Sequence, residues 1–522
     1  MFPNNIGRKP GSATIPSADS DVVFSSAKAV FSRTFAARRG TTKHRTLLSL
    51  RWAGLLLCLY VTPSATAQSD RYELGKRLQR FETTWESADE AARKRCLRPM
   101  QTAVTNFFSL KLRGAAAQLD EATFATLSAT PATPTERYAY SLQLLVTNRV
   151  SSTAETELGL QVTPFYEAPD VAIDDFQLLL QFEGLGHSHQ HRHQVDWKVA
   201  AAGCSLPTSS LPAGDYNLTA SLISGEQTIP FAQQMISRVE NWQARLERLR
   251  EANESPESTQ LTGTARATFA DLLSKLTAQS DQQTFEVDYP TNNLLELCES
   301  LVAAPAIANT TLREHSIEHD TWLTLADGYQ RINIRCRAPH TAKDNAPLPL
   351  LIAFHGAGGS ENMFFETYGA GRLPQLAVER GWLVASPRQS LFGLGMDSQQ
   401  IVTALAEIYP VDQQRIFFVG HSMGASQVVQ QVNRHPQLPS AAVALGGGGR
   451  AGRQASESKI PWYIAAGEFD FGRSGAKSLA NQLRNTAAKV SYREYPQVEH
   501  MVIVQAALDD VFQFLDQQTK EQ

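Results

Sequence analysis

The spacing of apolar residues changes several times along the chain. Within 68–134 apolar residues recur every three or four positions, which predicts a helical segment of two or three helices. Within 135–237 apolar and polar residues alternate in short runs separated by Pro, Gly and Asp, a pattern typical of a β-sandwich-like module. Helical spacing returns in 238–310, which we interpret as a helical linker region.

From 311 to 522 strand-length apolar runs alternate with amphipathic helical segments. This order is typical of a mostly parallel sheet whose faces are covered by helices, so we predict an α/β domain at this end of the chain. The expected strands are 322–325, 332–335, 348–354, 382–385, 415–419, 441–445, 463–466 and 490–494.

The first 67 residues have the pattern of a secretory signal peptide with a long n-region. A basic patch precedes the apolar run 52–61, and the small residues Ala65-Thr66-Ala67 follow soon after it. The run is too short to span a bilayer, which takes about 20 apolar residues, although a single N-terminal anchor is the alternative. We expect cleavage after Ala67, a secreted or periplasmic product, and no stable membrane span after processing.

Composition narrows the classes of function. The chain has 522 residues, 42% of them hydrophobic, and a net charge of −4. Nine Lys and Arg against two Asp give residues 1–67 a charge of +7, which leaves −11 on the rest. An acidic protein is poorly suited to holding phosphate backbones, so we expect no nucleic-acid partner. The cysteines beyond the leader either form disulfides or stay buried thiols: Cys96, Cys204, Cys298 and Cys336.

The strongest chemical motif is Gly-His-Ser-Met-Gly at 420–424, between the apolar run 415–419 and an amphipathic helix. The two glycines let the chain turn tightly from strand to helix, so that Ser422 projects from the turn. The helix N-terminus also favours negative charge that develops beside the serine. Ser422 is therefore the candidate nucleophile, whereas the turn should aim the neighbouring His421 away from it.

A second expected strand, 348–354, ends in His-Gly-Ala-Gly-Gly-Ser at 355–360. Acyl transfer creates an oxyanion that two aimed N–H groups must stabilise, and small residues let the backbone approach it. We expect the backbone N–H groups of Ala357 and Met423 to form this oxyanion hole, and His355 to be a structural turn residue. A phosphate-binding glycine loop is the alternative, but its characteristic spacings are not present.

The candidate acid and base follow the nucleophile in the chain. Asp470 comes shortly after one expected strand, and His500 lies in a loop after the next. His500 would accept the proton of Ser422, while Asp470 would orient the imidazole and offset its positive charge. Glu468 and Glu499 compete for the role of Asp470.

A histidine-rich segment is the one candidate metal site. On a strand its alternating imidazoles would share one face and could bind a transition metal. The segment has no carboxylate or thiolate at ligand spacing, however, and looks like a hairpin tip, so we interpret it as a solvated polar loop. We expect no metal and no cofactor. The four residues are His187, His189, His191 and His193.

With these motifs in place, residues 311–522 resemble an α/β-hydrolase fold serine hydrolase of the polyhydroxybutyrate-depolymerase-like or carboxylesterase-like branch. The resemblance rests on the motifs at 355–360 and 420–424, on Pro-Val-Asp at 410–412, and on the order of serine, aspartate and histidine. It implies an acyl-enzyme mechanism without a cofactor. Between 449 and 462 there is little room for the cap that many lipases insert, so we expect an open site unless the N-terminal modules cover it.

We therefore expect a secreted serine hydrolase that acts on a carboxylic ester through a Ser-Asp-His triad. One alternative is a serine peptidase of the prolyl-oligopeptidase type, although the residues before 311 show no repeated blades. Another is a catalytically silent binding protein whose β-sandwich-like module holds a partner. The acyl and alcohol parts of the substrate and the oligomeric state are left open.

Overall fold

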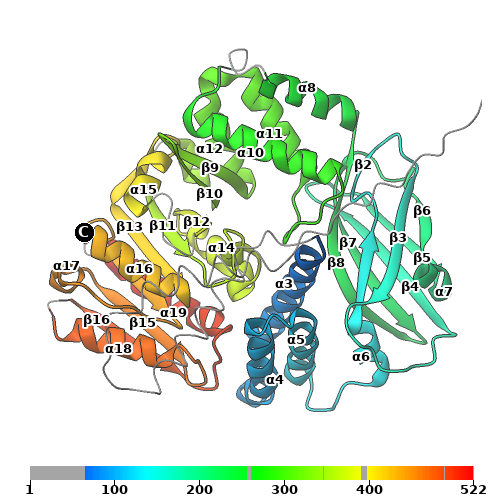
Figure 1. The fold of residues 1–522 in the computed structure, drawn as a ribbon, viewed down its shortest axis with the longest axis horizontal. Helices are drawn as coiled ribbons and strands as arrows, with labels where there is room; N and C mark the ends of the chain where they lie inside the picture. The colour runs from blue at the N-terminus through cyan, green and yellow to red at the C-terminus, as the bar shows by residue number, and fades with distance from the viewer. Residues whose placement is uncertain (1–64, 255–259, 345, 390–396, 487, 521–522) are drawn as a thin grey trace, which may run out of the picture. The chain divides into compact units, whose positions relative to one another are not determined.

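Figure 1 shows the computed structural model, which describes residues 65–254, 260–344, 346–389, 397–486 and 488–520. The predicted signal peptide at 1–67 lies outside these residues except for its last three, which begin helix α3 (Ala65–Glu86). Across the ranges described, no helix is both long enough and apolar enough to cross a bilayer.

The C-terminal part of the chain forms an eight-stranded, mostly parallel sheet flanked by helices, as its sequence pattern predicts. The strand order is β16-β15-β14-β13-β11-β12-β10-β9. Strand β10 runs antiparallel to both neighbours, and the other pairs are parallel. The bounds are β9 Thr321–Asp327, β10 Gln330–Arg337, β11 Leu348–Phe354, β12 Leu383–Pro387, β13 Val411–His421, β14 Ala441–Leu445, β15 Trp462–Gly467 and β16 Val490–Tyr495.

Both faces of the central strands are buried. In β11 the side chains of Leu350 and Ile352 belong to one apolar core, whereas those of Leu351 and Ala353 belong to another. The split follows from the two-residue period of a strand, which sends neighbouring side chains to opposite faces. Burial on both faces explains why these strands appear in the sequence as continuous apolar runs.

Helices from the same part of the chain cover the two faces. Val428 and Leu479 contribute to the core that contains Leu350, and Leu373 and Leu508 contribute to the core that contains Leu351. The helix bounds are α13 Met363–Glu366, α14 Arg372–Glu379, α15 Ser398–Ala406, α16 Met423–Arg434, α17 Arg453–Glu457, α18 Arg473–Arg484 and α19 Ile503–Lys520, with short 3-10 turns η2 His340–Asp344 and η3 Tyr368–Gly371.

Three N-terminal helices, drawn in blue in Figure 1, share one of these cores. They are α3, α4 (Glu90–Phe108) and α5 (Leu112–Leu127). Phe81, Trp85 and Leu119 from these helices are buried in the same apolar cluster as Leu351 of the sheet. The helical segment is therefore packed onto the C-terminal part of the chain rather than standing apart from it.

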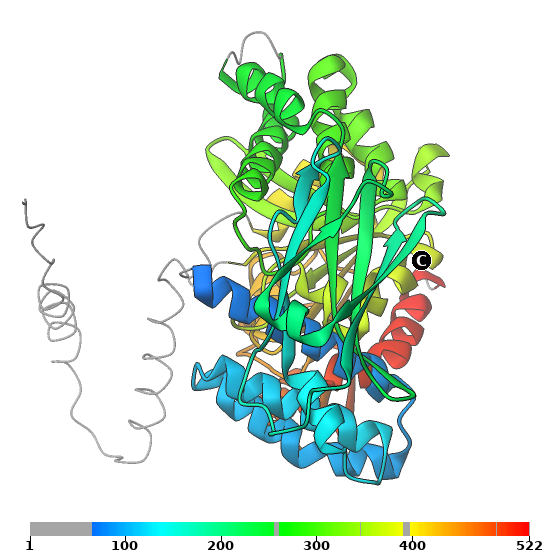
Figure 2. The ribbon, with the colours of Figure 1, turned by 90° about the vertical axis from the view of Figure 1, so that its right-hand side faces the viewer.

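The strands between these helices and the C-terminal part form two sheets around a core of their own (Figure 2). One sheet has the order β1-β3-β6 and the other β2-β8-β7-β4-β5. Leu144 and Leu160 of the first sheet pack with Leu180 and Leu218 of the second. The bounds are α6 Pro134–Ser141, β1 Leu142–Val146, β2 Val150–Ser152, β3 Glu157–Pro164, β4 Phe176–Gly184, β5 Gln190–Asp196, α7 Trp197–Ala202, β6 Cys204–Pro207, β7 Gly214–Ser224 and β8 Gln227–Val239.

The histidine-rich segment is only partly the loop that we expected. Strand β5 begins at Gln190, so His191 and His193 lie on an edge strand that pairs with β4. An edge strand pairs through its backbone and does not need an apolar face, which is why its polar sequence was mistaken for a loop. Among the residues described, no cluster of three or more His, Cys, Asp or Glu is arranged to hold a metal ion.

A second helical group lies against the edge strand β9. The backbone N–H of Thr324 donates to Thr268 Oγ1 at 3.0 Å, and that of Ala326 donates to Thr264 Oγ1 at 3.2 Å. These bonds cover a sheet edge that would otherwise be open to pairing. The segment that we interpreted as a linker is thus also packed on the sheet. Its elements are α8 Trp242–Glu254, α10 Gly263–Ser280, α11 Thr291–Ala303, η1 Pro305–Ile307 and α12 Ala308–Glu318.

The four cysteines beyond the leader are free thiols. Cys96, Cys298 and Cys336 are buried, and Cys204 is half-buried. Of the two alternatives that the sequence left open, the structure therefore has the unpaired one.

Candidate active site

Strand β13 brings Ser422 to the edge of the sheet where the parallel strands end. The strand ends at His421 and α16 begins at Met423, so Ser422 alone makes the turn between them. Its φ of 57° and ψ of −116° lie in a region that non-glycine residues rarely adopt. A strained serine on a strand-to-helix turn is the backbone geometry that exposes a nucleophilic hydroxyl.

The two glycines of the motif are required by close backbone contacts. A Cβ added at Gly420 would lie 2.2 Å from the carbonyl oxygen of Gly424, and one at Gly424 would lie 1.9 Å from that of Phe354. The end of β11, the turn and the start of α16 therefore touch through their backbones. A side chain at Gly420 would push the start of α16 away from the end of β13, and one at Gly424 would push it away from the end of β11.

Ser422, His500 and Asp470 form a continuous chain of hydrogen bonds. His500 Nε2 lies 2.9 Å from Ser422 Oγ, and His500 Nδ1 lies 2.6 Å from Asp470 Oδ1. Asp470 follows β15 and His500 follows β16, so neighbouring parallel strands carry both residues to the edge where β13 ends. Both side chains are buried, at 1% exposure for His500 and 5% for Asp470.

Asp470 is held in its charged form. Burial raises the pKa of its carboxyl group, but His500 and the backbone N–H of Gly472 lower it by more, so the net shift is downward. The Gly472 N–H donates to Asp470 Oδ1 at 2.6 Å. A carboxylate at Nδ1 fixes the tautomer of a neutral imidazole, which leaves Nε2 of His500 free to accept the hydroxyl proton of Ser422.

The two competing carboxylates lie elsewhere. Glu468 is exposed, and its Oε2 accepts a hydrogen bond from the backbone N–H of Gln497 at 3.0 Å. Glu499 is buried, its Oε2 accepts from the Met501 N–H at 2.8 Å, and burial raises its pKa to about 7. The carboxylate that is hydrogen-bonded to the imidazole of His500 is therefore that of Asp470.

His421 contacts the site through the backbone of His500. Its Nε2 donates to the His500 carbonyl oxygen at 3.0 Å, and its ring lies 4.6 Å from the ring of Tyr368. Burial and the neighbouring His500 lower the pKa of His421 to about 3, so its imidazole is neutral. It positions the loop that carries His500, a role that its place beside the nucleophile in the sequence did not reveal.

The 355–360 segment lies against Ser422. A Cβ added at Gly356 would come within 3.2 Å of the Ser422 Cβ, and Ala357 lines the same cavity as the serine. Met423 is the first residue of α16, so its backbone N–H has no acceptor within the helix. Ala357 and Met423, whose N–H groups we predicted as oxyanion donors, are thus a lining residue of this cavity and the residue that follows Ser422, respectively.

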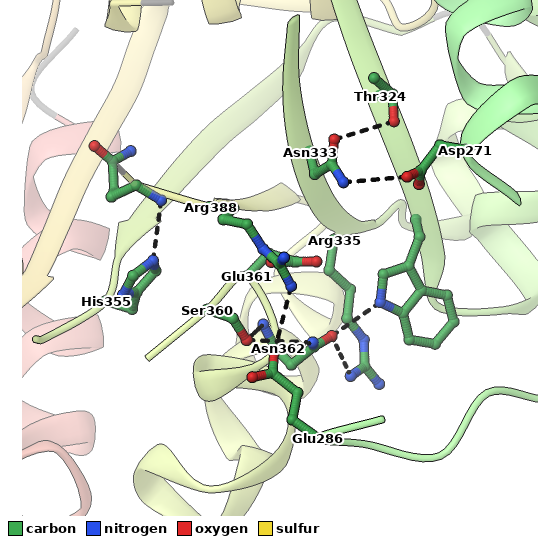
Figure 3. A network of polar contacts seen from close by, with 12 residues as sticks. Asp271, Glu286, Thr324, Asn333, Arg335, His355, Ser360, Glu361, Asn362 and Arg388 are labelled. Carbon is green, nitrogen blue, oxygen red and sulfur yellow. Dashed lines mark hydrogen bonds and ion pairs between the residues drawn. The ribbon is translucent and has the colours of Figure 1, made fainter. Parts of the chain in front are cut away.

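Buried polar contacts of His355, Ser360 and Asn362 hold this segment in place (Figure 3). His355 accepts the backbone N–H of Gln389 through Nε2 at 3.0 Å, so its Nδ1 carries the proton and donates to the Gly356 carbonyl at 2.8 Å. Asn362 accepts from Trp322 Nε1 at 2.9 Å and donates to Glu286 Oε1 at 3.1 Å. His355 is thus a structural residue, and the segment cannot shift without breaking several buried hydrogen bonds.

A cavity opens at Ser422, and α3–α5 form part of its wall. Its empty volume is about 1170 Å³ with the open mouth included. The wall from α3–α5 is made largely of apolar side chains, among them Leu78, Met100, Val104 and Phe107. No motif in 68–134 indicates that these helices line a cavity. A helix face that lines a cavity has the same apolar spacing as one that packs in a core.

Helix α3 is tied to the loops on both sides of the cavity. Arg71 donates from its guanidinium to the carbonyl oxygen of Gly358 at 3.1 Å. Further along the helix, the buried carboxylate of Glu82 accepts the backbone N–H groups of Gly369 at 2.6 Å and Ala370 at 3.2 Å. Gly369 and Ala370 both have positive φ, which turns their N–H groups toward the same Glu82 oxygen, Oε2.

Comparison with known proteins gives partial likenesses only. No family model and no curated protein matches the sequence. Similar solved structures include a thermostable esterase, at 20% identity over 38% of this chain and 63% of its own, less than two thirds of its length, with a TM-score of 0.33. An S-formylglutathione hydrolase from Agrobacterium tumefaciens has 14% identity over 38% of this chain and 96% of its own, with a TM-score of 0.31. A ferulic acid esterase has 14% identity over 38% and 98%, with a TM-score of 0.34.

Proposed function

We propose that the protein is a serine hydrolase that cleaves carboxylic esters. The observation that carries the proposal is the hydrogen-bonded chain from Ser422 through His500 to Asp470, anchored on a strained turn at the end of β13. Export after removal of residues 1–67 is part of the same proposal and rests on the signal-peptide pattern.

The reaction has two steps. Ser422 Oγ attacks the ester carbonyl carbon while His500 Nε2 takes the hydroxyl proton, and His500 returns that proton to the leaving alcohol as the C–O bond breaks. A water molecule then attacks the acyl carbon and gives a proton to His500, which passes it to Ser422 Oγ as the bond between the acyl carbon and that oxygen breaks and the acid leaves. Asp470 stabilises the imidazolium in both steps, and the N–H groups of Ala357 and Met423 stabilise the oxyanion.

Two alternatives share parts of this site. A peptidase of the prolyl-oligopeptidase type would use the same three residues, but the two unequal sheets before 311 are not repeated blades. A catalytically silent binding protein would not need Ser422, His500 and Asp470 within hydrogen-bonding distance of one another, so the 2.9 Å and 2.6 Å contacts favour an enzyme.

The test compares p-nitrophenyl butyrate with peptide p-nitroanilides. We expect the ester to be cleaved, and Ser422→Ala to lower its kcat by about 10⁴-fold or more. Ser426→Ala is the matched control, because Ser426 lies on the same helix but on its exposed side, and it should keep wild-type turnover. Faster turnover of the anilides would favour the peptidase, and full ester turnover by Ser422→Ala would exclude the proposed mechanism.

A further inference from the structure

We propose that α3–α5 form the binding site for a neutral, apolar acyl chain, so that the substrate is an ester of an aliphatic monocarboxylic acid longer than acetate. This inference rests on the proposed function and adds the class of substrate. It assigns a role to the N-terminal helical segment, which supplies no residue to the triad.

The part of the cavity wall that comes from α3–α5 is mainly apolar. Phe107 and Phe108 of α4 are half-buried and line the cavity next to Ser422, together with the buried Leu78 and Val104. Protein interiors are normally packed without large voids, so an apolar cavity that reaches a reactive group is a candidate binding site for an apolar ligand. Water gains no hydrogen bonds from such a wall, whereas a hydrocarbon chain gains contacts with it.

The lysine and the two glutamates that line the cavity are each paired with an opposite charge, whereas Arg71 makes a hydrogen bond to a carbonyl oxygen. Lys76 pairs with Asp288 at 2.8 Å, and Arg71 donates to the Gly358 carbonyl at 3.1 Å. Glu366 pairs with Arg335 at 2.7 Å. A charged or sugar-like acyl group would have to displace these contacts. Its own polar atoms would also lie against an apolar wall without hydrogen-bond partners, so a neutral hydrocarbon chain fits better.

The position of His500 separates the acyl side from the alcohol side. The leaving alcohol must receive the proton from His500 Nε2, so it lies beside that imidazole, where the ring of Phe471 stands 3.9 Å away and is 49% exposed. The acyl chain extends past the 355–360 segment and along Phe107 rather than Phe108, because Phe108 of α4 packs against Phe471 on the alcohol side, with ring centroids 5.7 Å apart. There Phe107 of α4 approaches so closely that a Cβ at Gly358 would lie 3.1 Å from its ring.

Gly75 offers a way to fill the cavity without disturbing the fold. It lies on α3 and lines the cavity, and a Cβ added there would meet no atom within 4 Å. Replacing a glycine inside a helix also favours the helix. Gly75→Leu and Gly75→Phe should therefore fold and occupy the acyl site. Thr83→Leu is the matched control, because it adds the same leucine to an exposed position of the same helix.

The experiment measures kcat/KM for p-nitrophenyl esters from acetate to decanoate, and for acetates of alcohols from ethanol to octanol. Burial of each methylene can raise kcat/KM by about fourfold, so the wild-type protein should prefer hexanoate over acetate by roughly tenfold or more. Gly75→Leu and Gly75→Phe should lower the hexanoate-to-acetate ratio by roughly tenfold or more. Thr83→Leu should keep the wild-type ratio.

The two proposals fail in different ways. If turnover of the acetate ester depends on Ser422 but kcat/KM does not rise with acyl length, the acyl-chain site is wrong and the proposed esterase function is unaffected. A Gly75→Leu protein that loses long alcohols rather than long acyl chains would overturn the assignment of the cavity to the acyl side. If no ester were turned over at all, the proposed function would fail and the acyl-chain site with it.

Discussion

The cavity at Ser422 has two walls of different physical character. The wall from the C-terminal loops is polar and strained: it holds a serine at φ 57° and two hydrogen bonds of 2.9 Å and 2.6 Å between buried groups. The wall from α3–α5 presents mainly apolar side chains, such as Phe107 and Phe108. In our proposal the catalytic residues belong to the first wall, and the second wall selects esters by the length of their acyl chain.

This difference leads to separable effects. Substitutions in the polar wall should change the rate for all esters by the same factor, because they act on the reacting atoms. Substitutions in the apolar wall should change the ratio between long and short esters, because they act on the buried hydrocarbon. Arg71 joins the two walls, since it reaches from α3 to the carbonyl oxygen of Gly358.

The largest effect is expected from Asp470→Asn. Losing the carboxylate removes the charge that stabilises the imidazolium and favours the wrong tautomer of His500, so kcat should fall by about 10⁴-fold. The fall should be equal for acetate and hexanoate esters in steady-state assays, because Asp470 belongs to the polar wall.

The control for this variant is Glu468→Gln, which alters an exposed carboxylate on the same loop. It should keep nearly full activity. A larger loss in Glu468→Gln than in Asp470→Asn would mean that the wrong carboxylate has been paired with His500.

A smaller effect is expected from Glu499→Gln, at the junction of the two walls. Burial raises the pKa of Glu499 from the ordinary 4.5 to about 7, and the negative charge of Asp470 adds to the rise. On α3, the buried Glu82 carboxyl also has a raised pKa, chiefly through burial and in part through Glu499. A raised carboxyl pKa means that the folded state binds the proton more tightly, so stability falls as the pH rises from about 4.5 through 7.

Glu499→Gln removes this titration. Urea unfolding at pH 5 and pH 8 should show that the variant gains up to about 3 kcal/mol relative to wild type at the higher pH and little at the lower one. A variant that is less stable than wild type at pH 8 would mean that the charged form of Glu499 contributes to folding.

Much of the C-terminal part could be predicted from the sequence because its signals are local. A strand buried on both faces appears as a continuous apolar run, and the motif around Ser422 needs glycines where the backbones of β11, β13 and α16 touch. Asp470 and His500 each follow a strand, and parallel strands bring such positions to one edge. The order of elements therefore predicted that Asp470 and His500 lie near each other, but it left Glu468 and Glu499 as competitors for the contact with the imidazole.

The rest depends on packing between distant segments. Phe81 and Leu119 have ordinary helical spacing, and nothing near them in the sequence indicates that they share a core with Leu351 or that their neighbours line a cavity. The hydrogen bond from His421 to the His500 carbonyl spans 79 positions and likewise has no local signal. Strand β5 was mistaken for a loop because an edge strand can be polar on both faces.

The most direct test of the account is covalent labelling with a fluorophosphonate, followed by intact mass measurement and peptide mapping. We expect one adduct per chain, on Ser422. It should form quickly in the wild-type protein and only slowly in His500→Ala, because Nε2 of His500 must take the hydroxyl proton. A folded wild-type protein that stays unlabelled at Ser422, or that carries its adduct on another residue, would contradict it.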